Sequence, residues 1–214
     1  MTDIAKIECY KCKKLLADNL VLPKGLCVYC AADEADELPQ PQKQEKISQK
    51  EQNAQVRAEQ ELAKRILSRK RMLPFVEKFN PDYQAGWVHK DICNRLEKFS
   101  QDVADEKSPR LMLFMPPRHG KSTLASIAFP AWHLGRNPGH EFISCSYSGS
   151  LAMSFSRKVR QVLREPNYKK VFESTKLDKD SQSVESWQTT QGGGYVAAGV
   201  GGGITGKGAH ILLI

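Results

Sequence analysis

The chain has 214 residues, of which 40% are hydrophobic and 26% charged, and its formal net charge is +8. This length and composition suit one medium-sized core with an appendage. No apolar run reaches the ~18 residues of a spanning helix, and the N-terminus has no apolar signal core, so we expect a cytoplasmic protein without a membrane segment. The positive charge favours a polyanionic partner such as nucleic acid, although a cationic surface that binds nothing would also explain it.

Four cysteines near the N-terminus form two C-x2-C pairs, Cys9 with Cys12 and Cys27 with Cys30, separated by fourteen residues. Tetrahedral Zn²⁺ takes four thiolates from such pairs. Residues 1–31 have too few apolar side chains to fold without a metal, so we predict a zinc module there. Unligated thiols in a tail, or a redox C-x2-C, are the alternatives. The other two cysteines, at positions 93 and 145, lie among apolar residues and are predicted to be core.

Residues 32–72 are predicted to form a charged linker that leads into a solvated helix. An acidic cluster and two prolines come first, followed by a stretch rich in Gln, Glu, Lys and Arg. Positions 43–71 hold nine Lys or Arg against four Glu, a net of +5. This helix either tracks DNA phosphates or is a spacer with ordinary i,i+4 pairs.

Residues 73–109 are predicted to be largely helical, because apolar side chains recur at helical spacing from Trp87 to Phe99. Leu111 to Met115 then alternates as a buried strand does, and two prolines form a turn. A helix bent at Pro130 is predicted over 122–134.

Gly120, Lys121 and Ser122 occupy the turn between that strand and that helix. A triphosphate needs inward backbone N–H groups, a cation on its β- and γ-phosphates and a hydroxyl on Mg²⁺, which Gly, Lys and Ser supply at a helix N-terminus. The pattern G-x-x-x-x-G-K-[ST] is met at its last three positions, with Met115 in place of the first Gly. The alternative is a turn in which Gly breaks the strand and Ser caps the helix.

Beyond this turn, the sequence predicts a strand over 140–147 and a helix over 150–164 that carries Arg157, Arg160 and Arg164. Nine of the fifteen glycines fall in 192–208, which indicates either close backbone approach to a ligand or a mobile loop. Residues 209–214 are predicted to form an apolar strand.

Three strings, PPRHGKS at 116–122, FISCSYS at 142–148 and GVGGGITGKGAHILLI at 199–214, resemble the large terminase subunit of tailed bacteriophages. That family pumps double-stranded DNA into procapsids by hydrolysing ATP, and it often uses a P-x-R-x-G-K-[ST] loop, which accounts for Met115. The resemblance covers about residues 73–214. It implies a three-layer α/β P-loop NTPase core with a parallel sheet, incomplete at its C-terminus and preceded by the zinc module and the helical linker.

The resemblance also implies roles for single residues. Lys121 would neutralise the β- and γ-phosphates, Ser122 would hold Mg²⁺, Thr123 would contact the α-phosphate and Arg118 would act near the γ-phosphate. Tyr83, Gln84 and Trp87 are candidates to contact the adenine, with His89 a weaker one, although ordinary packing explains them as well. The implied nucleotide site therefore comprises Gln84, Pro117, Arg118, His119, Gly120, Lys121, Ser122 and Thr123, with Arg118 and Lys121 as catalytic candidates and ATP and Mg²⁺ as cofactors.

In the same family, residues 209–214 would be the strand of a Walker B motif and Lys207 would be a phosphate contact in a coupling loop. The resemblance also allows Arg157 or Arg160 to reach a neighbouring subunit, with a solvated cationic face as the alternative for these arginines. The acids after that strand and the nuclease domain are not in this sequence. We therefore expect an N-terminal part of a terminase large subunit that is deficient in hydrolysis on its own. The implied partners are double-stranded DNA, the portal protein, the small terminase subunit and further copies in a ring, in the cytoplasm of a bacterial host.

Two other functions remain open on sequence alone. One is a helicase or another P-loop motor outside viruses. The second is a zinc-dependent nucleic-acid-binding or adaptor protein with a vestigial P-loop.

Overall fold

The computed structural model describes residues 6–8, 13, 15–17 and 41–214. The chain divides into two units, Met1–Glu59 and Gln60–Ile214. In the first unit, strands β1 (Lys6–Glu8) and β2 (Leu15–Ala17) pair antiparallel, with Glu8 opposite Leu15. Helix α2 (Pro41–Lys70) begins in the first unit and ends in the second.

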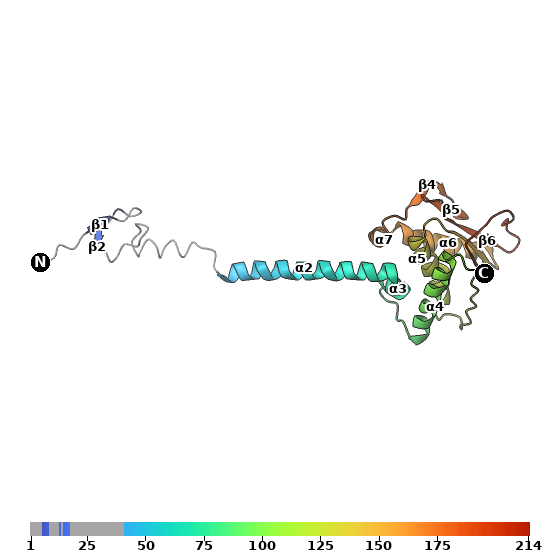
Figure 1. Ribbon diagram of the computed structural model, residues 1–214, viewed down its shortest axis with the longest axis horizontal. Helices are drawn as coiled ribbons and strands as arrows, with labels where there is room; N and C mark the ends of the chain where they lie inside the picture. Colours follow the sequence, from blue (N-terminus) through green and yellow to red (C-terminus); the bar gives the residue numbers. More distant parts are fainter. Residues whose placement is uncertain (1–5, 9–12, 14, 18–40) are drawn as a thin grey trace. The chain divides into compact units, whose positions relative to one another are not determined.

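The second unit holds the other helices and strands, whose order along the chain can be followed in Figure 1. The remaining helical elements are α3 (Met72–Phe79), α4 (Trp87–Ala104), η2 (Thr123–Ala128), α5 (Phe129–Arg136), α6 (Gly149–Arg164) and α7 (Pro166–Val171). The strands are β3 (Glu141–Ser146), β4 (Leu177–Gln182), β5 (Ser186–Thr189), β6 (Gly194–Gly199) and β7 (Ile211–Leu213).

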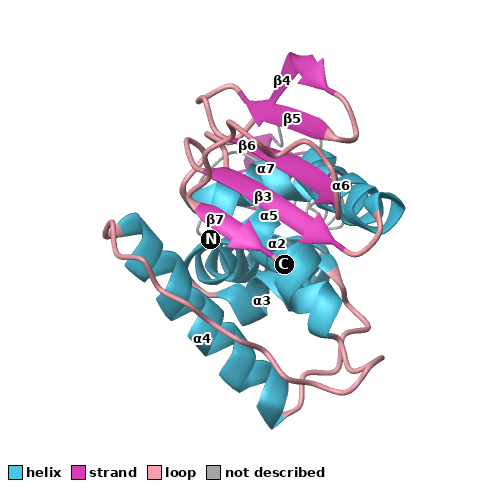
Figure 2. Ribbon diagram, turned by 90° about the vertical axis from the view of Figure 1, so that its right-hand side faces the viewer, coloured by secondary structure: helices cyan, strands magenta, loops and turns pink. Residues whose placement is uncertain are grey.

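These five strands form one mixed sheet in the order β4-β5-β6-β3-β7 (Figure 2). Strand β3 lies parallel to both β6 and β7, whereas β4-β5 and β5-β6 are antiparallel. Helix α6 contacts β3 and β6 and also α5. The α/β class predicted from the sequence is therefore correct, but the sheet is mixed, because a hairpin of β4 and β5 precedes β6. The three-layer P-loop arrangement stays a prediction.

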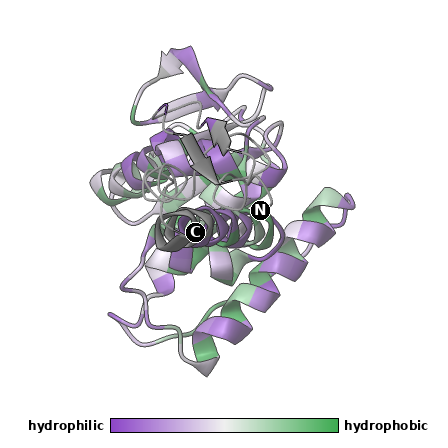
Figure 3. Ribbon diagram, turned by 90° about the vertical axis from the view of Figure 1, so that its left-hand side faces the viewer, coloured by the Kyte–Doolittle hydropathy of each residue, from purple (hydrophilic) through white to green (hydrophobic). Residues whose placement is uncertain are grey.

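The helices predicted from apolar spacing are present. Helix α4 buries Ile92, Cys93 and Leu96 and turns its charged residues outward, so green and purple alternate around it in Figure 3. Strand β3 and helix α6 lie within a residue or two of the predicted ranges. Within the described residues, no helix combines the length and the apolar character needed to cross a membrane.

The predicted strand at 111–115 is not formed. Its alternation is real, because Leu111, Leu113 and Met115 pack against the core while Met112 and Phe114 are 80% and 91% exposed. A strand also needs the backbone edge of a neighbour, and residues 111–115 pair with none of the five strands of the sheet. The sequence pattern predicted which side chains are buried but not the pairing.

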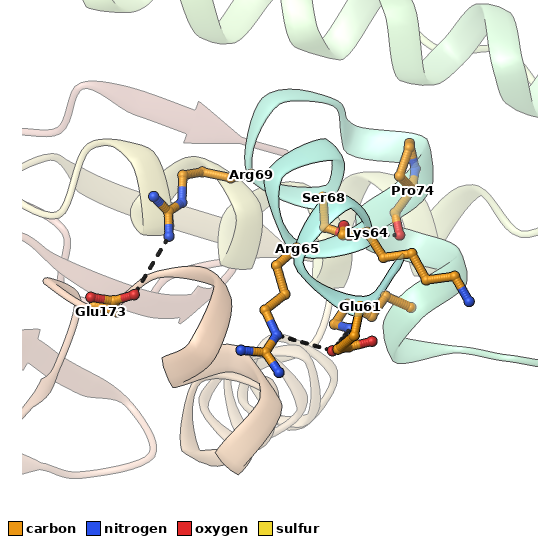
Figure 4. A network of polar contacts seen from close by, with 8 residues as sticks. Glu61, Lys64, Arg65, Ser68, Arg69, Pro74 and Glu173 are labelled. Atoms are coloured by element: carbon orange, nitrogen blue, oxygen red, sulfur yellow. Dashed lines mark hydrogen bonds and ion pairs between the residues drawn. The ribbon is translucent and has the colours of Figure 1, made fainter. Parts of the chain in front are cut away.

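The end of α2 is fastened to the rest of its unit by a polar network (Figure 4). Glu61 accepts from Lys78 at 2.9 Å and from Arg65 at 3.0 Å, and these bonds, Lys78 first, lower the pKa of Glu61 to about 2. The Ser68 hydroxyl donates to the carbonyl of Pro74, and the Ser68 carbonyl accepts from the buried Trp132 indole N–H. Residues 61–70 are therefore part of the fold.

Aromatic side chains fill much of the core. One group joins α3 to α7 through Phe75, Phe79, Tyr168 and Phe172, with ring centroids 4.6 to 6.2 Å apart. On the sheet, Trp187 and Tyr195 stack at 5.3 Å. Burial on this scale dominates the stability of such a domain.

Candidate functional site

The GKS segment, residues 116–123, connects the irregular stretch after α4 to the helix that starts at Lys121. Two of its residues have left-handed backbone angles, Arg118 with φ of 63° and Gly120 with φ of 82°. Such angles favour Gly and are uncommon elsewhere. The alternation of handedness turns the backbone sharply just before the helix, which is the geometry by which successive N–H groups form an anion-binding concavity.

Lys121 and Ser122 are exposed at the start of this helix, and Thr123 is half-buried. The helix continues as η2, a π-helical stretch, and then as α5. Pro130 lies in the first turn of α5, and the Phe129 N–H just before it bonds to the Leu124 carbonyl, five residues back. A proline clashes with the carbonyl four residues earlier, so the wider π turn accommodates the ring at the predicted site of bending.

The segment before α4 lies against the GKS segment. His89 Nε2 is 3.0 Å from the His119 carbonyl, and its Nδ1 accepts from the Gly86 N–H at 3.0 Å. A Cβ on Gly120 would lie 2.9 Å from the Tyr83 hydroxyl. The structure thus brings two of the candidates for the adenine contact, Tyr83 and the weaker His89, next to the GKS segment.

The two other candidates for the adenine contact do not share this packing. Trp87 is 80% exposed, so the interpretation of it as an ordinary core residue is wrong. Gln84 is exposed as well. Both follow Tyr83 within four residues, on the solvent side of the same segment.

The four cysteines of the predicted zinc module, Cys9, Cys12, Cys27 and Cys30, lie outside the described residues. Among the residues that are described, no cluster of three or more His, Cys, Asp or Glu is arranged to hold a metal. Cys93 is fully buried, as predicted, and burial raises the pKa of its thiol to about 12. Cys145 is half-buried in β3.

The basic end of α2 makes contacts within the fold. Arg69 Nε donates to the Val171 carbonyl at 2.7 Å, and Arg71, the residue that follows α2, pairs with Glu97 at 2.8 Å. Arg65 already pairs with Glu61. These arginines support the spacer interpretation for this part of the helix. On α6, Arg160 donates to the Ser183 carbonyl, and its pKa is lowered by burial and by its neighbours Arg164 and Arg157.

The glycine-rich region has two structural uses. Gly193 and Gly199 sit where a Cβ would collide with backbone, of Pro138 and His140 in the first case and of Gly149 in the second. Gly201 and Gly206 have φ of 79° with open space around them. Close approach to the protein's own backbone thus explains why positions 193 and 199 are glycine. The exposed Lys207 borders a hollow of about 390 Å³ beside β5 and β6.

Sequence reasoning missed a chain of histidines. His133 is fully buried, with Nδ1 2.8 Å from the Ser100 hydroxyl and Nε2 3.0 Å from His140 Nδ1. The ring of His140 stacks on His210 at 4.2 Å, and His210 Nδ1 accepts from the Glu141 N–H. His133, His140 and His210 follow Ser100 by 33, 40 and 110 positions, so no local pattern links them. His210 has a structural contact here.

Residues 112–214 match the family model described as terminase large subunit, T4likevirus-type, N-terminal. The match includes the GKS segment, β3, the glycine-rich region and β7, so it contains all three strings on which the resemblance was based. Neither the curated proteins nor the solved structures contain a match to this chain.

Proposed function

Because residues 112–214 belong to the N-terminal part of the terminase large-subunit family, we propose that this chain provides the nucleotide-binding part of a motor that packages phage DNA. The family supports a role in DNA packaging, with DNA and packaging proteins as partners. ATP as the fuel, the portal protein and small subunit as specific partners, and a ring of copies are parts of this proposal.

The GKS segment is the observation that carries the proposal. Its two left-handed residues, Arg118 and Gly120, precede a helix start at which Lys121 and Ser122 are exposed. Within the described residues, no ion pair occupies Lys121, so its ammonium group is available to an anion. A helix N-terminus adds a favourable field for phosphate.

These residues suit a nucleoside triphosphate with Mg²⁺. We propose that Lys121 binds the β- and γ-phosphates, Ser122 holds Mg²⁺ and Thr123 contacts the α-phosphate. Arg118 lies within the turn and would offer its guanidinium to the γ-phosphate. Pro117 and His119 complete the loop, and the exposed Gln84 would contact the base. Bound ATP supplies the phosphoryl group whose transfer to water releases the energy for DNA movement.

The test is nucleotide binding by the full chain. In Lys121→Ala, a charge-assisted contact worth about 1.5 to 3 kcal/mol is lost, so the Kd for a fluorescent ATP analogue with Mg²⁺ should rise roughly 10- to 100-fold. Lys90→Ala removes an exposed lysine on α4 and serves as the control. Equal affinity of the two variants would contradict the proposal.

A further inference from the structure

The GKS segment is held from one side by the short stretch that leads into α4. His89 lies in the first turn of α4, where its Nδ1 accepts from the Gly86 N–H at 3.0 Å. Since a backbone N–H can only donate, Nδ1 is unprotonated and the proton of the neutral ring is on Nε2. That N–H donates to the His119 carbonyl at 3.0 Å.

Tyr83 also packs against the GKS segment, next to His89. Its ring meets the His89 ring edge-on, with centroids 5.4 Å apart. A Cβ on Gly120 would lie 2.9 Å from the Tyr83 hydroxyl and 3.6 Å from His89 Nε2. The two rings therefore fill the space beside Gly120, where φ is 82°.

The Tyr83 hydroxyl is buried and has no hydrogen-bond partner within the described part of the chain. Burial raises the pKa of Tyr83 to about 12, so the hydroxyl keeps its proton. A buried donor without an acceptor costs stability. The ring thus packs beside Gly120 at a cost in stability, a pattern that is typical of functional sites.

We infer that Tyr83 and His89 are positioning residues that clamp the GKS segment in its phosphate-binding conformation. His89 fixes the carbonyl between the two left-handed residues, and Tyr83 blocks the movement of Gly120 toward α4. The clamp lowers the cost of ordering the loop when phosphate binds. This inference rests on the proposed function of the loop, and it adds two residues outside the matched region, 112–214.

The experiment combines hydrogen exchange of the nucleotide-free chain with nucleotide affinity. In His89→Ala, amide exchange at residues 117–123 should accelerate at least ~10-fold, because the loop opens more often, and the Kd for the ATP analogue should rise by a similar factor. His89→Gln keeps a side-chain N–H and should recover part of both effects. Tyr83→Phe keeps the ring and should leave both close to wild type. Lys90→Ala, one position from His89, is the matched control.

Unchanged exchange at 117–123 in His89→Ala would overturn the clamp. Faster exchange with unaltered nucleotide affinity would also overturn it, because the contact would then be structural only. If His89→Ala does not fold, Tyr83→Ala, which removes the ring beside Gly120, carries the same comparison and should accelerate exchange at 117–123 and raise the Kd. A failure of the proposed function itself gives a different result. In that case Lys121→Ala would bind nucleotide as tightly as the wild type, whatever the exchange rates at residues 117–123 are.

Discussion

At position 135, the packing of a neighbouring ring leaves room only for glycine. Gly135 is buried in the last turn of α5, and a Cβ there would collide with the ring of Phe172. That ring cannot retreat easily, since it is 3% exposed and lies between Phe75 and Tyr168. Gly is otherwise a poor choice inside a helix, by about 1 kcal/mol relative to Ala. Packing therefore outweighs helix propensity at this position.

We predict that Gly135→Ala lowers the free energy of unfolding by up to about 2 kcal/mol, because overpacking costs about 1 to 3 kcal/mol and the gain in helix propensity offsets about 1 kcal/mol of it. The urea midpoint measures this change. Gly203→Ala is the matched control, because nothing lies within 4 Å of that position, and it should shift the free energy by less than about 0.5 kcal/mol. Equal effects of the two substitutions would refute the packing argument.

Among the secondary-structure elements, α4, α5 and β3 are joined by the buried His133. Its imidazole contacts Ser100 of α4 on one side and His140, just before β3, on the other. Burial, and then the nearby His140, Arg136 and His210, lower the pKa of His133 to about 3. Burial and His210 also lower the pKa of His140.

This arrangement predicts acid sensitivity. An unfolded His titrates near 6.5 and the folded His133 near 3. Between these values the unfolded chain binds a proton that the folded chain does not. The contribution of His133 to the free energy of unfolding is therefore fully present above pH 6.5, and it decreases by about 1.4 kcal/mol for each pH unit below that value. Urea unfolding from pH 7 to 4 measures the slope. His133→Phe should flatten it, leaving the smaller part due to His140, and an undiminished slope would exclude His133 as its source.

At the scale of the whole molecule, the N-terminal unit contains the predicted zinc module. Strands β1 and β2 flank the first C-x2-C pair in the sequence, and the four cysteines have the spacing of a zinc site. Of the two cysteines in the second unit, Cys93 is unsuited to a metal because its thiol is buried and its pKa is about 12. The candidate ligands are therefore Cys9, Cys12, Cys27 and Cys30.

We predict that the purified chain carries about one equivalent of zinc by elemental analysis, since four thiolates form one tetrahedral site. Cys9→Ser should lower the zinc content sharply and make the first 40 residues more sensitive to protease, because such a module folds only around its metal. Cys145→Ser, in the second unit, should retain the zinc. A chain without metal and with a protease-resistant N-terminus would rule out the module and, with it, the adaptor alternative.

The sequence predicted the elements whose signal is local. Helix α4 follows from apolar residues at helical spacing, β3 from a continuous apolar run, and the turn before the helix at Lys121 from the two prolines and Gly120. The hairpin of β4 and β5 was not predicted, because Leu177–Gln182 is almost entirely polar and charged and has no apolar alternation. Part of the site was also foreseeable, since Tyr83 and His89 were already candidates, but their contact with Gly120 was not.

By itself, the sequence determined the α/β class, the helices and the loop that matches the terminase family, because burial periodicity and turn chemistry are properties of adjacent residues. The tertiary structure alone decided the mixed strand order, the missing partner of residues 111–115 and the chain from Ser100 through His133 to His140 and His210. It also decided that Trp87 faces solvent while Tyr83 packs against the loop. These outcomes depend on which distant segments meet, and a periodic pattern shows that a face is buried without showing what buries it.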